Sequence, residues 1–439
     1  MSSRVTISAS GIARRAFIRV GALSLLEISQ SQYLRARAAT SQQDTKAKAQ
    51  ACILIFLEGG PSHVDLWDPK PNSSFKPIAT NVAGVQISEL LPRMARQMDK
   101  VAIIRSMHTE ESNHPPAAYY AFTGHRPTAA MQFPSLGAIV TKELGARHNV
   151  PPHVNIPGWK GGAYEGYLKA GFLGPAYDPM IVPDPSREDF QVEDLSLPKS
   201  LPVEALNDRR SFLTVIDQAY RQRVETAEYA SMDNFTRQAM QMVLTPEVRA
   251  AFDLSKETEK TKEAYGRHSL GQTLLLARRL VEGGSRFITA GGNQLSGWDT
   301  HSDNDKRVGK LLPVLDQSLS ALLEDLKERG LFDSTIVLAM GEFGRTPYLN
   351  SKGGRDHWPN CWSMVVGGGG LRGGQVVGSS DERGGEVADR MVSMGDLFAT
   401  IYKAMGIDWH KEYPSPIGRP VKIANSIGDR TGEVITELI

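Results

Sequence analysis

Cysteine is scarce in this 439-residue sequence, which contains only Cys52 and Cys361. Two cysteines so far apart exclude a disulfide-rich scaffold and a metal clamp built from cysteine pairs, and we expect both to be structural. An excess of charge of one sign is also missing, because 50 Lys and Arg residues almost balance 49 Asp and Glu residues. A chain this close to neutrality has no field to hold a polyanion, so we expect no nucleic-acid partner.

Long hydrophobic runs are absent as well. No apolar run reaches the roughly 20 residues that a membrane-spanning helix needs, so we expect contact with a membrane only during export. Hydrophobic residues make up 41% of the chain and charged residues 23%, which is typical of a globular protein and excludes a disordered one. The 41 glycines and 25 prolines follow no fixed period and predict turns around a layered fold.

The N-terminal segment has a composition of its own, with six arginines and one glutamate in residues 1–40. Arg14 and Arg15 precede a short apolar stretch at 20–28, a layout that resembles a twin-arginine signal peptide. Glu27 interrupts the apolar stretch, and a basic tail is the alternative interpretation. We expect residues 1–40 to be a signal peptide and the protein to be periplasmic or extracellular.

Residues 41–439 are predicted to form an α/β domain. Short apolar runs that stop at glycine or polar turns are typical of buried parallel strands, and helical patterns lie between them. The runs are 51–57, 101–104, 286–290, 335–340 and 363–366, and the helical patterns are 117–122, 212–242, 268–282, 308–329 and 396–405. This alternation predicts a mainly parallel central sheet with helices on both faces and ligands at the carboxyl ends of the strands. The polar segment 184–262 is predicted to be a helical insertion.

Acidic residues and histidines gather where these strands are predicted to end. They are Glu58 and Asp65 after the first run, Asp299 and His301 after the third, and Glu342 and His357 after the fourth. Carboxylates and imidazoles bind zinc, calcium, manganese or magnesium, so these residues predict a divalent metal site. The alternatives are caps or turns for Asp65 and Asp299, and a buried structural ion pair for Glu342.

Two further residues are candidates for direct chemistry. His114 stands just before the helical pattern 117–122, and the N-terminus of a helix favours an anionic group. A helix cap is the alternative role. Arg345 follows a predicted strand end, and a guanidinium binds oxyanions through two parallel hydrogen bonds. We therefore predict His114 and Arg345 as catalytic residues.

Five motifs occur in an order that resembles one exported family. The motifs are "FLEGGPSHVDLWDPKP", "NHPPAAYYAFTGHRP", "GWDTH", "GEFGRTP" and "GGRDHWP". Their order resembles the family catalogued as domain of unknown function 1501, over roughly residues 50–410. That family is similar to the alkaline phosphatase and sulfatase superfamily, whose members hydrolyse phosphate or sulfate esters with metal ions at the carboxyl ends of a parallel sheet. The resemblance implies a fold of that type.

The resemblance also implies roles for single positions. Metal-ligand positions of the superfamily are occupied by Glu58 or its rival Asp65, and by Asp299, His301, Glu342 and His357. His114 stands at the nucleophile position, where the superfamily has Ser, Thr or Cys, and Phe343 replaces a metal-binding His or Asn. An imidazole can accept a phosphoryl group and release it to water. His114 is therefore left as a nucleophile or a metal ligand.

Three functions are compatible with these residues. The leading hypothesis is an exported, metal-dependent hydrolase of a phosphate or sulfate ester, whose substrate is a small molecule or a glycan. The alternative is a catalytically silent protein that binds an anionic glycan or a metal in the same crevice. A phosphoryl mutase is less compatible with export, because such enzymes usually act on cytosolic metabolites.

Overall fold

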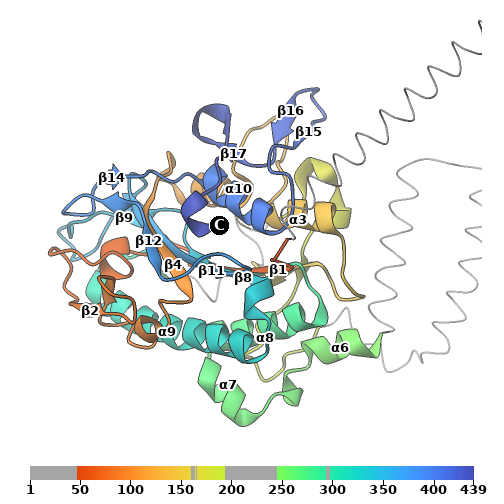
Figure 1. Cartoon of the computed structure of the whole chain (residues 1–439), viewed down its shortest axis with the longest axis horizontal. Coiled ribbons are helices and arrows are strands. Elements are labelled where there is room, and N and C mark those ends of the chain that lie inside the picture. The colour runs from red at the N-terminus through yellow and green to blue at the C-terminus, as the bar shows by residue number, and fades with distance from the viewer. Residues whose placement is uncertain (1–46, 160–163, 165, 193–244, 293–296) are drawn as a thin grey trace, which may run out of the picture. The chain divides into compact units, whose positions relative to one another are not determined.

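The computed structural model describes residues 47–159, 164, 166–192, 245–292 and 297–439, and an eight-stranded sheet lies at its centre (Figure 1). In spatial order the strands are β12 (Gln375–Val377), β4 (Val101–Met107), β11 (Trp362–Gly368), β8 (Thr335–Met340), β1 (Ala51–Phe56), β7 (Phe287–Ala290), β5 (His153–Ile156) and β6 (Met180–Ile181). Each of the five predicted runs overlaps one strand of this sheet, to within one residue at the ends of 51–57 and 286–290. The two cysteines are buried and free.

Strand β11 is the one strand of the sheet that runs antiparallel to its neighbours. It pairs antiparallel with both β4 and β8, whereas the other adjacent pairs are parallel. The connection from β8 to β11 contains no helix, and adjacent parallel strands need a long crossover, usually helical. The predicted mainly parallel α/β sheet is confirmed, with β11 as its reversed member.

Helices cover both faces of the sheet. Seven α-helices lie in the described residues: α2 (His114–Thr123), α3 (Leu136–Leu144), α6 (Pro246–Phe252), α7 (Glu259–Tyr265), α8 (Ser269–Gly283), α9 (Asn304–Glu328) and α10 (Met394–Ala404). In Figure 1, α8 and α9 lie on one side of β1 and β8, and α10 and α3 lie on the other. The predicted arrangement of helices on both faces is therefore confirmed.

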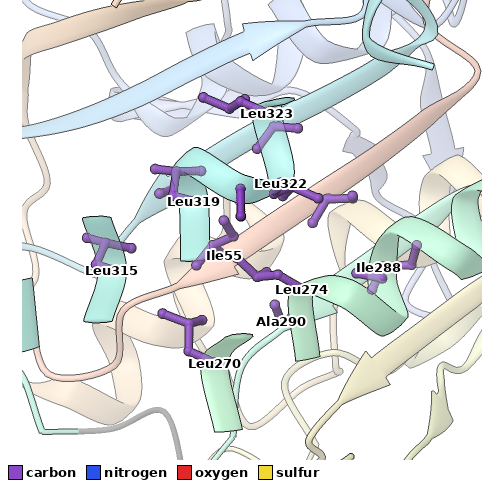
Figure 2. Close-up of a cluster of buried hydrophobic side chains, with 14 of the residues drawn as sticks. Ile55, Leu270, Leu274, Ile288, Ala290, Leu315, Leu319, Leu322 and Leu323 are labelled. Carbon is purple, nitrogen blue, oxygen red and sulfur yellow. The ribbon is translucent and has the colours of Figure 1, made fainter. Parts of the chain in front are cut away.

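Alternation along β1 explains these two layers. Ile53 and Ile55 belong to the hydrophobic cluster that contains α8 and α9, whereas Leu54 and Phe56 belong to the cluster of α2, α3 and α10. Successive side chains of a strand point to opposite faces, so a strand that is covered on both faces is apolar throughout. Figure 2 shows Ile55 packed among leucines of α8 and α9, including Leu274 and Leu319.

Local chemistry sets the ends of the long helices. Helix α8 begins where His268 Nδ1 accepts a hydrogen bond from the Gly271 amide at 3.2 Å, and it ends at Gly284, whose φ of 112° suits glycine. Helix α10 begins with a capping box between Ser393 and Asp396. These boundaries lie within two residues of the predicted patterns at 268–282 and 396–405.

Part of the predicted helical insertion lies in the described residues. Helix α6 lies within the segment 184–262 and packs against α8, whereas α7 begins within it, ends at Tyr265 and packs against α8 and α9. Buried Arg278 of α8 stabilises this packing, because its guanidinium lies 2.8 Å from both Glu257 and Asp325. The predicted helix 212–242 and the predicted signal peptide 1–40 lie outside the described residues.

Smaller elements complete the described chain. Two-stranded ribbons are formed by β2 (Pro77–Ala79) with β3 (Gln86–Ser88), β9 (Gly344–Arg345) with β10 (His357–Trp358), β13 (Ser379–Ser380) with β14 (Val387–Asp389), β15 (Glu412–Pro414) with β16 (Pro420–Lys422), and β17 (Asn425–Ser426) with β18 (Arg430–Thr431). None of the helices in the described residues is long and apolar enough to cross a membrane.

The sheet topology brings four predicted loops to one edge. Strands β7, β1 and β8 are adjacent and parallel, and β4 runs in the same direction beyond β11. The loops that leave the carboxyl ends of these strands contain the candidate residues, and such edges are where α/β proteins bind ligands.

Candidate metal centre

Three imidazoles meet around one carboxylate oxygen at this edge. The Nε2 atoms of His301, His114 and His357 lie 3.1, 3.3 and 3.4 Å from Oδ1 of Asp299. The Nε2 atoms of His301 and His357 are 2.9 Å apart. The chain segments that follow β4, β7 and β8 supply these four residues, with His114 at the first position of α2 and His357 at the first position of β10. The structure thus brings together side chains that are far apart in the sequence.

The other nitrogen of each imidazole faces an oxygen acceptor. The Nδ1 atoms of His114, His301 and His357 lie 2.6 Å from Glu342 Oε1, Asp356 Oδ1 and the Ser112 carbonyl oxygen. Each Nδ1 lies closer to its acceptor than the Nε2 of the same ring lies to Asp299 Oδ1. In the neutral, metal-binding form of each ring we therefore assign the hydrogen to Nδ1 and the lone pair to Nε2. Metal-binding histidines are usually held in this way by a carboxylate or a backbone carbonyl.

Glu342 lies behind His114. Its side chain is fully buried and accepts a hydrogen bond from the Gly59 amide at 3.1 Å. With one oxygen engaged by both His114 and Gly59, the carboxylate orients the imidazole and ties the loop after β1 to the end of β8. The predicted metal ligand Glu342 is therefore placed as a support for His114.

All three guanidinium nitrogens of Arg345 donate hydrogen bonds to groups of the protein. Its side chain is fully buried, Nε donates to the Gly60 carbonyl at 2.9 Å, and Nη1 donates to the Arg355 carbonyl at 3.0 Å. Nη2 donates to the Gly59 carbonyl and, at 2.5 Å, to Asp299 Oδ1. The guanidinium predicted to bind a substrate oxyanion thus holds Asp299 in place against the loop after β1.

Asp65, another predicted ligand, lies in a separate buried network. Its carboxylate is fully buried and accepts two hydrogen bonds from Arg355, at 2.9 and 3.2 Å. Ser62 and Ser73 donate to it at 2.6 Å, and Asn304 at 2.9 Å. Four side chains occupy its two oxygens, so the structure does not bring Asp65 to the metal-ligand cluster, and we leave it out of the proposed ligand set.

Glu58 lies beside the cluster. Its Oε2 accepts a hydrogen bond from the Trp159 indole at 2.7 Å. Burial raises the pKa of this carboxyl above its usual value, and the nearby charge of Glu342 adds to the rise. Of the two alternative ligands predicted after β1, Glu58 therefore lies near the metal-ligand cluster and Asp65 does not. Glu58 is not part of the group of converging ligand atoms.

The electrostatics of the centre favour a cation. Burial by itself would lower the pKa of His114, but the charges of Asp299 and Glu342 outweigh it and raise this pKa to about 9. Burial would raise the pKa of Asp299, but His114, His357 and Arg345 outweigh it and lower this pKa well below its usual range. Negative charge therefore dominates around the imidazoles.

The donor set fits a divalent metal ion. Ligand atoms of His114, Asp299 and His357 lie within 4.8 Å of one another, and His301 Nε2 lies beside two of them. His114 Nε2 is buried and makes no hydrogen bond within the described residues. With no metal bound, the carboxylates keep a proton on this imidazole. A bound cation would displace that proton and take the Nε2 lone pair.

Two further residues, Phe343 and Asp356, support the imidazoles of the centre in ways that the sequence does not reveal. Phe343 is fully buried, and its ring centroid lies 5.0 Å from that of His114 and 4.7 Å from that of His357. Asp356 orients His301 and not its neighbour His357. Asp356 and His357 are neighbours in the motif "GGRDHWP", but successive residues of an extended chain point in opposite directions.

Several solved structures are similar in part to this chain. A lipoteichoic acid synthase from Listeria monocytogenes is 11% identical, with 89% of this chain and 79% of that chain covered and a TM-score of 0.41. A sulfatase from Pseudoalteromonas sp. is 12% identical, with 86% and 72% covered and a TM-score of 0.39. An alkaline phosphatase from the Antarctic bacterium TAB5 is 10% identical, with 82% and 99% covered and a TM-score of 0.38.

A family model identifies the chain more directly. No curated protein matches it, but the model described as "Protein of unknown function (DUF1501)" matches residues 49–439. This match includes every motif on which the predicted resemblance depends and all four residues of the cluster around Asp299. The prediction of the family is confirmed, and the chain belongs to the DUF1501 family.

Proposed function

We propose that this protein is an exported, metal-dependent hydrolase of phosphate or sulfate esters. The observation that carries the proposal is the convergence of three imidazole Nε2 atoms on Asp299 Oδ1 at the carboxyl ends of the sheet strands. The side chains of Asp299 and His301 are 43% and 45% exposed, so a substrate in solution can reach the centre. The five motifs that resemble the alkaline phosphatase and sulfatase superfamily support an ester as the substrate.

In this proposal Asp299, His301 and His357 hold a divalent metal ion. Such an ion would polarise the ester oxygen and neutralise charge that develops as the bond breaks. Arg345 keeps Asp299 aimed at the imidazoles through its bonds to backbone carbonyls. Glu58, whose pKa burial raises, retains a proton to higher pH, as a general acid for the departing alcohol must.

The test is hydrolysis of sulfate and phosphate monoesters by the natively exported protein. We expect turnover that a chelator removes and that zinc, manganese, calcium or magnesium restores. An Asp299→Ala, His357→Ala double variant should lose both the bound metal and the turnover. His410→Ala is the matched control, because that side chain is 66% exposed and pairs with Asp408, away from the metal-ligand cluster. Metal-loaded wild-type protein that hydrolyses no ester of either class would contradict the proposal.

A second candidate is a silent protein that binds an anionic glycan or a metal. Two observations favour it: Arg345 is occupied by protein acceptors, and His114 stands where the resembling superfamily has its usual nucleophile. Metal-dependent binding of a sulfated glycan without release of sulfate would support this candidate over the hydrolase.

A further inference from the structure

The role of His114 follows from which of its two ring nitrogens is already engaged in a hydrogen bond. Nδ1 lies 2.6 Å from Glu342 Oε1, and Glu342 is itself fully buried and held by the Gly59 amide. Because this acceptor cannot turn toward solvent without losing its own partner, the imidazole is fixed with Nδ1 inward. Nε2 is the nitrogen left for any other interaction.

The Nε2 atom of His114 faces other potential metal ligands. Nε2 lies 3.3 Å from Asp299 Oδ1, and the imidazole centroid lies 4.3 Å from that of His357. Phe343 packs against both rings. A nucleophile needs its lone pair aimed at the reacting centre of a substrate, whereas this lone pair is aimed at the same carboxylate oxygen as those of His301 and His357.

The composition of the cluster sets the class of ion. Three nitrogens and one carboxylate oxygen point inward, while Glu342 and Asp356 use their oxygens to hold imidazole Nδ1 atoms. Calcium takes six to eight oxygen ligands and magnesium an octahedron of oxygens. Imidazole-rich sites suit zinc and related transition ions, and zinc accepts four ligands of this kind.

We propose that His114 is a metal ligand and not the nucleophile, and that it completes with His301, His357 and Asp299 a nitrogen-rich centre that selects zinc-class ions over calcium and magnesium. This inference rests on the metal centre of the proposed function and specifies its ligands and its ion. Glu342 is then a positioning residue that acts through His114.

The test is calorimetric titration of the chelator-stripped full chain with zinc, manganese, calcium and magnesium salts, one at a time. We expect zinc to bind at least about 1,000-fold more tightly than calcium or magnesium. His114→Ala should weaken zinc binding by about 100-fold or more, and Glu342→Gln by about 10-fold to 100-fold. His410→Ala, a change at an exposed histidine, should leave the zinc affinity unchanged.

X-ray absorption at the zinc edge gives a second measurement, which does not depend on any variant folding. Three imidazoles bound to zinc in the wild-type protein would support the assignment, and two or fewer would overturn it. Equal affinities for zinc and calcium, or an unchanged zinc affinity in His114→Ala, would also overturn it.

These outcomes separate the inference from the proposed function. Zinc bound through three imidazoles in a protein without ester turnover would support the ligand assignment and contradict the hydrolase. A His114→Ala protein that keeps its zinc affinity but loses turnover would overturn the ligand assignment and leave the hydrolase standing.

Discussion

Asp65 and Asp299 are residues of one type whose surroundings give them different roles. Both follow a strand of the sheet and both were predicted as metal ligands. Asp65 is fully buried and paired with Arg355, whereas Asp299 is 43% exposed and faces three histidines. The partner of Asp65 lies 290 positions away in the sequence, so no local pattern could distinguish a buried ion pair from a ligand.

Substitution of Asp65 should affect stability and not metal content. Asp65→Asn would leave the guanidinium of Arg355 buried without a counter-charge, and removal of one partner from a buried pair costs about 3–5 kcal/mol. We expect a urea denaturation experiment to show a loss of free energy of unfolding near this range, with unchanged metal stoichiometry. Asp189→Asn is the control, because Asp189 forms an exposed pair with Arg187 and such pairs contribute about 1 kcal/mol or less. Loss of the metal from folded Asp65→Asn protein would restore Asp65 as a ligand.

The candidate site could be predicted in part from single residues. His114, Asp299, His301 and His357 were all identified, because histidines and acids at strand ends form a recognisable pattern. Of their acceptors, Glu342 was identified, although as a metal ligand, whereas a backbone carbonyl such as that of Ser112 leaves no trace in the sequence. The sequence therefore predicts which residues carry the chemistry better than it predicts what orients them.

At the scale of elements, the turn after β1 is positioned by a close backbone contact. Gly59 has a φ of 115°, and a Cβ added to it would lie 2.3 Å from the backbone nitrogen of Asp299. The backbone of the loop after β1 therefore packs directly on the loop after β7. This contact, together with the bond from the Gly59 amide to Glu342, holds the turn against two other elements of the site.

Gly59→Ala should disturb the centre through this contact. The methyl group would push the Asp299 backbone away, so we expect both a loss of stability and a clear fall in metal affinity. Gly330→Ala is the matched control, because Gly330 has a φ of 68° but open space where an added Cβ would lie; it should cost only about 1 kcal/mol of backbone strain. Thermal unfolding and calorimetric titration of both variants measure the difference. Equal metal affinity in the two variants would show that the contact does not position Asp299.

The elements that the sequence predicts are the long ones. Strands β1 and β8 have six buried residues each, and all of them except Thr335 are apolar, a pattern that leaves little ambiguity. Strand β5 contains the polar residues His153 and Asn155, and β6 has only two residues, so neither forms an apolar run that the sequence could reveal. The reversal of β11 depends on how the chain returns from β8, which is a property of tertiary packing and not of the strand.

At the scale of the whole molecule, buried histidines make stability depend on pH. Burial lowers the pKa of both His125 and His153 to about 4. His153 lies in β5, where Nδ1 donates to the Tyr177 carbonyl at 3.2 Å, and its buried Nε2 has no hydrogen-bond partner among the described residues. Protonation of this ring would place a charged imidazolium inside the core, which is unfavourable.

His153 should therefore weaken the fold as the medium becomes acidic. Above pH 6.5, its ordinary pKa, the ring is neutral in the folded and the unfolded chain and contributes no pH dependence. Below that pH the unfolded chain takes up a proton that the folded chain refuses until about pH 4, so the free energy of unfolding falls across this window by on the order of 3 kcal/mol. His153→Asn keeps a donor for the Tyr177 carbonyl but cannot titrate, so urea unfolding at pH 7 and pH 4.5 should show a smaller fall than in the wild type. His410→Asn, at an exposed site, should keep the wild-type fall, and an equal fall in both variants would show that burial of His153 does not set the acid sensitivity.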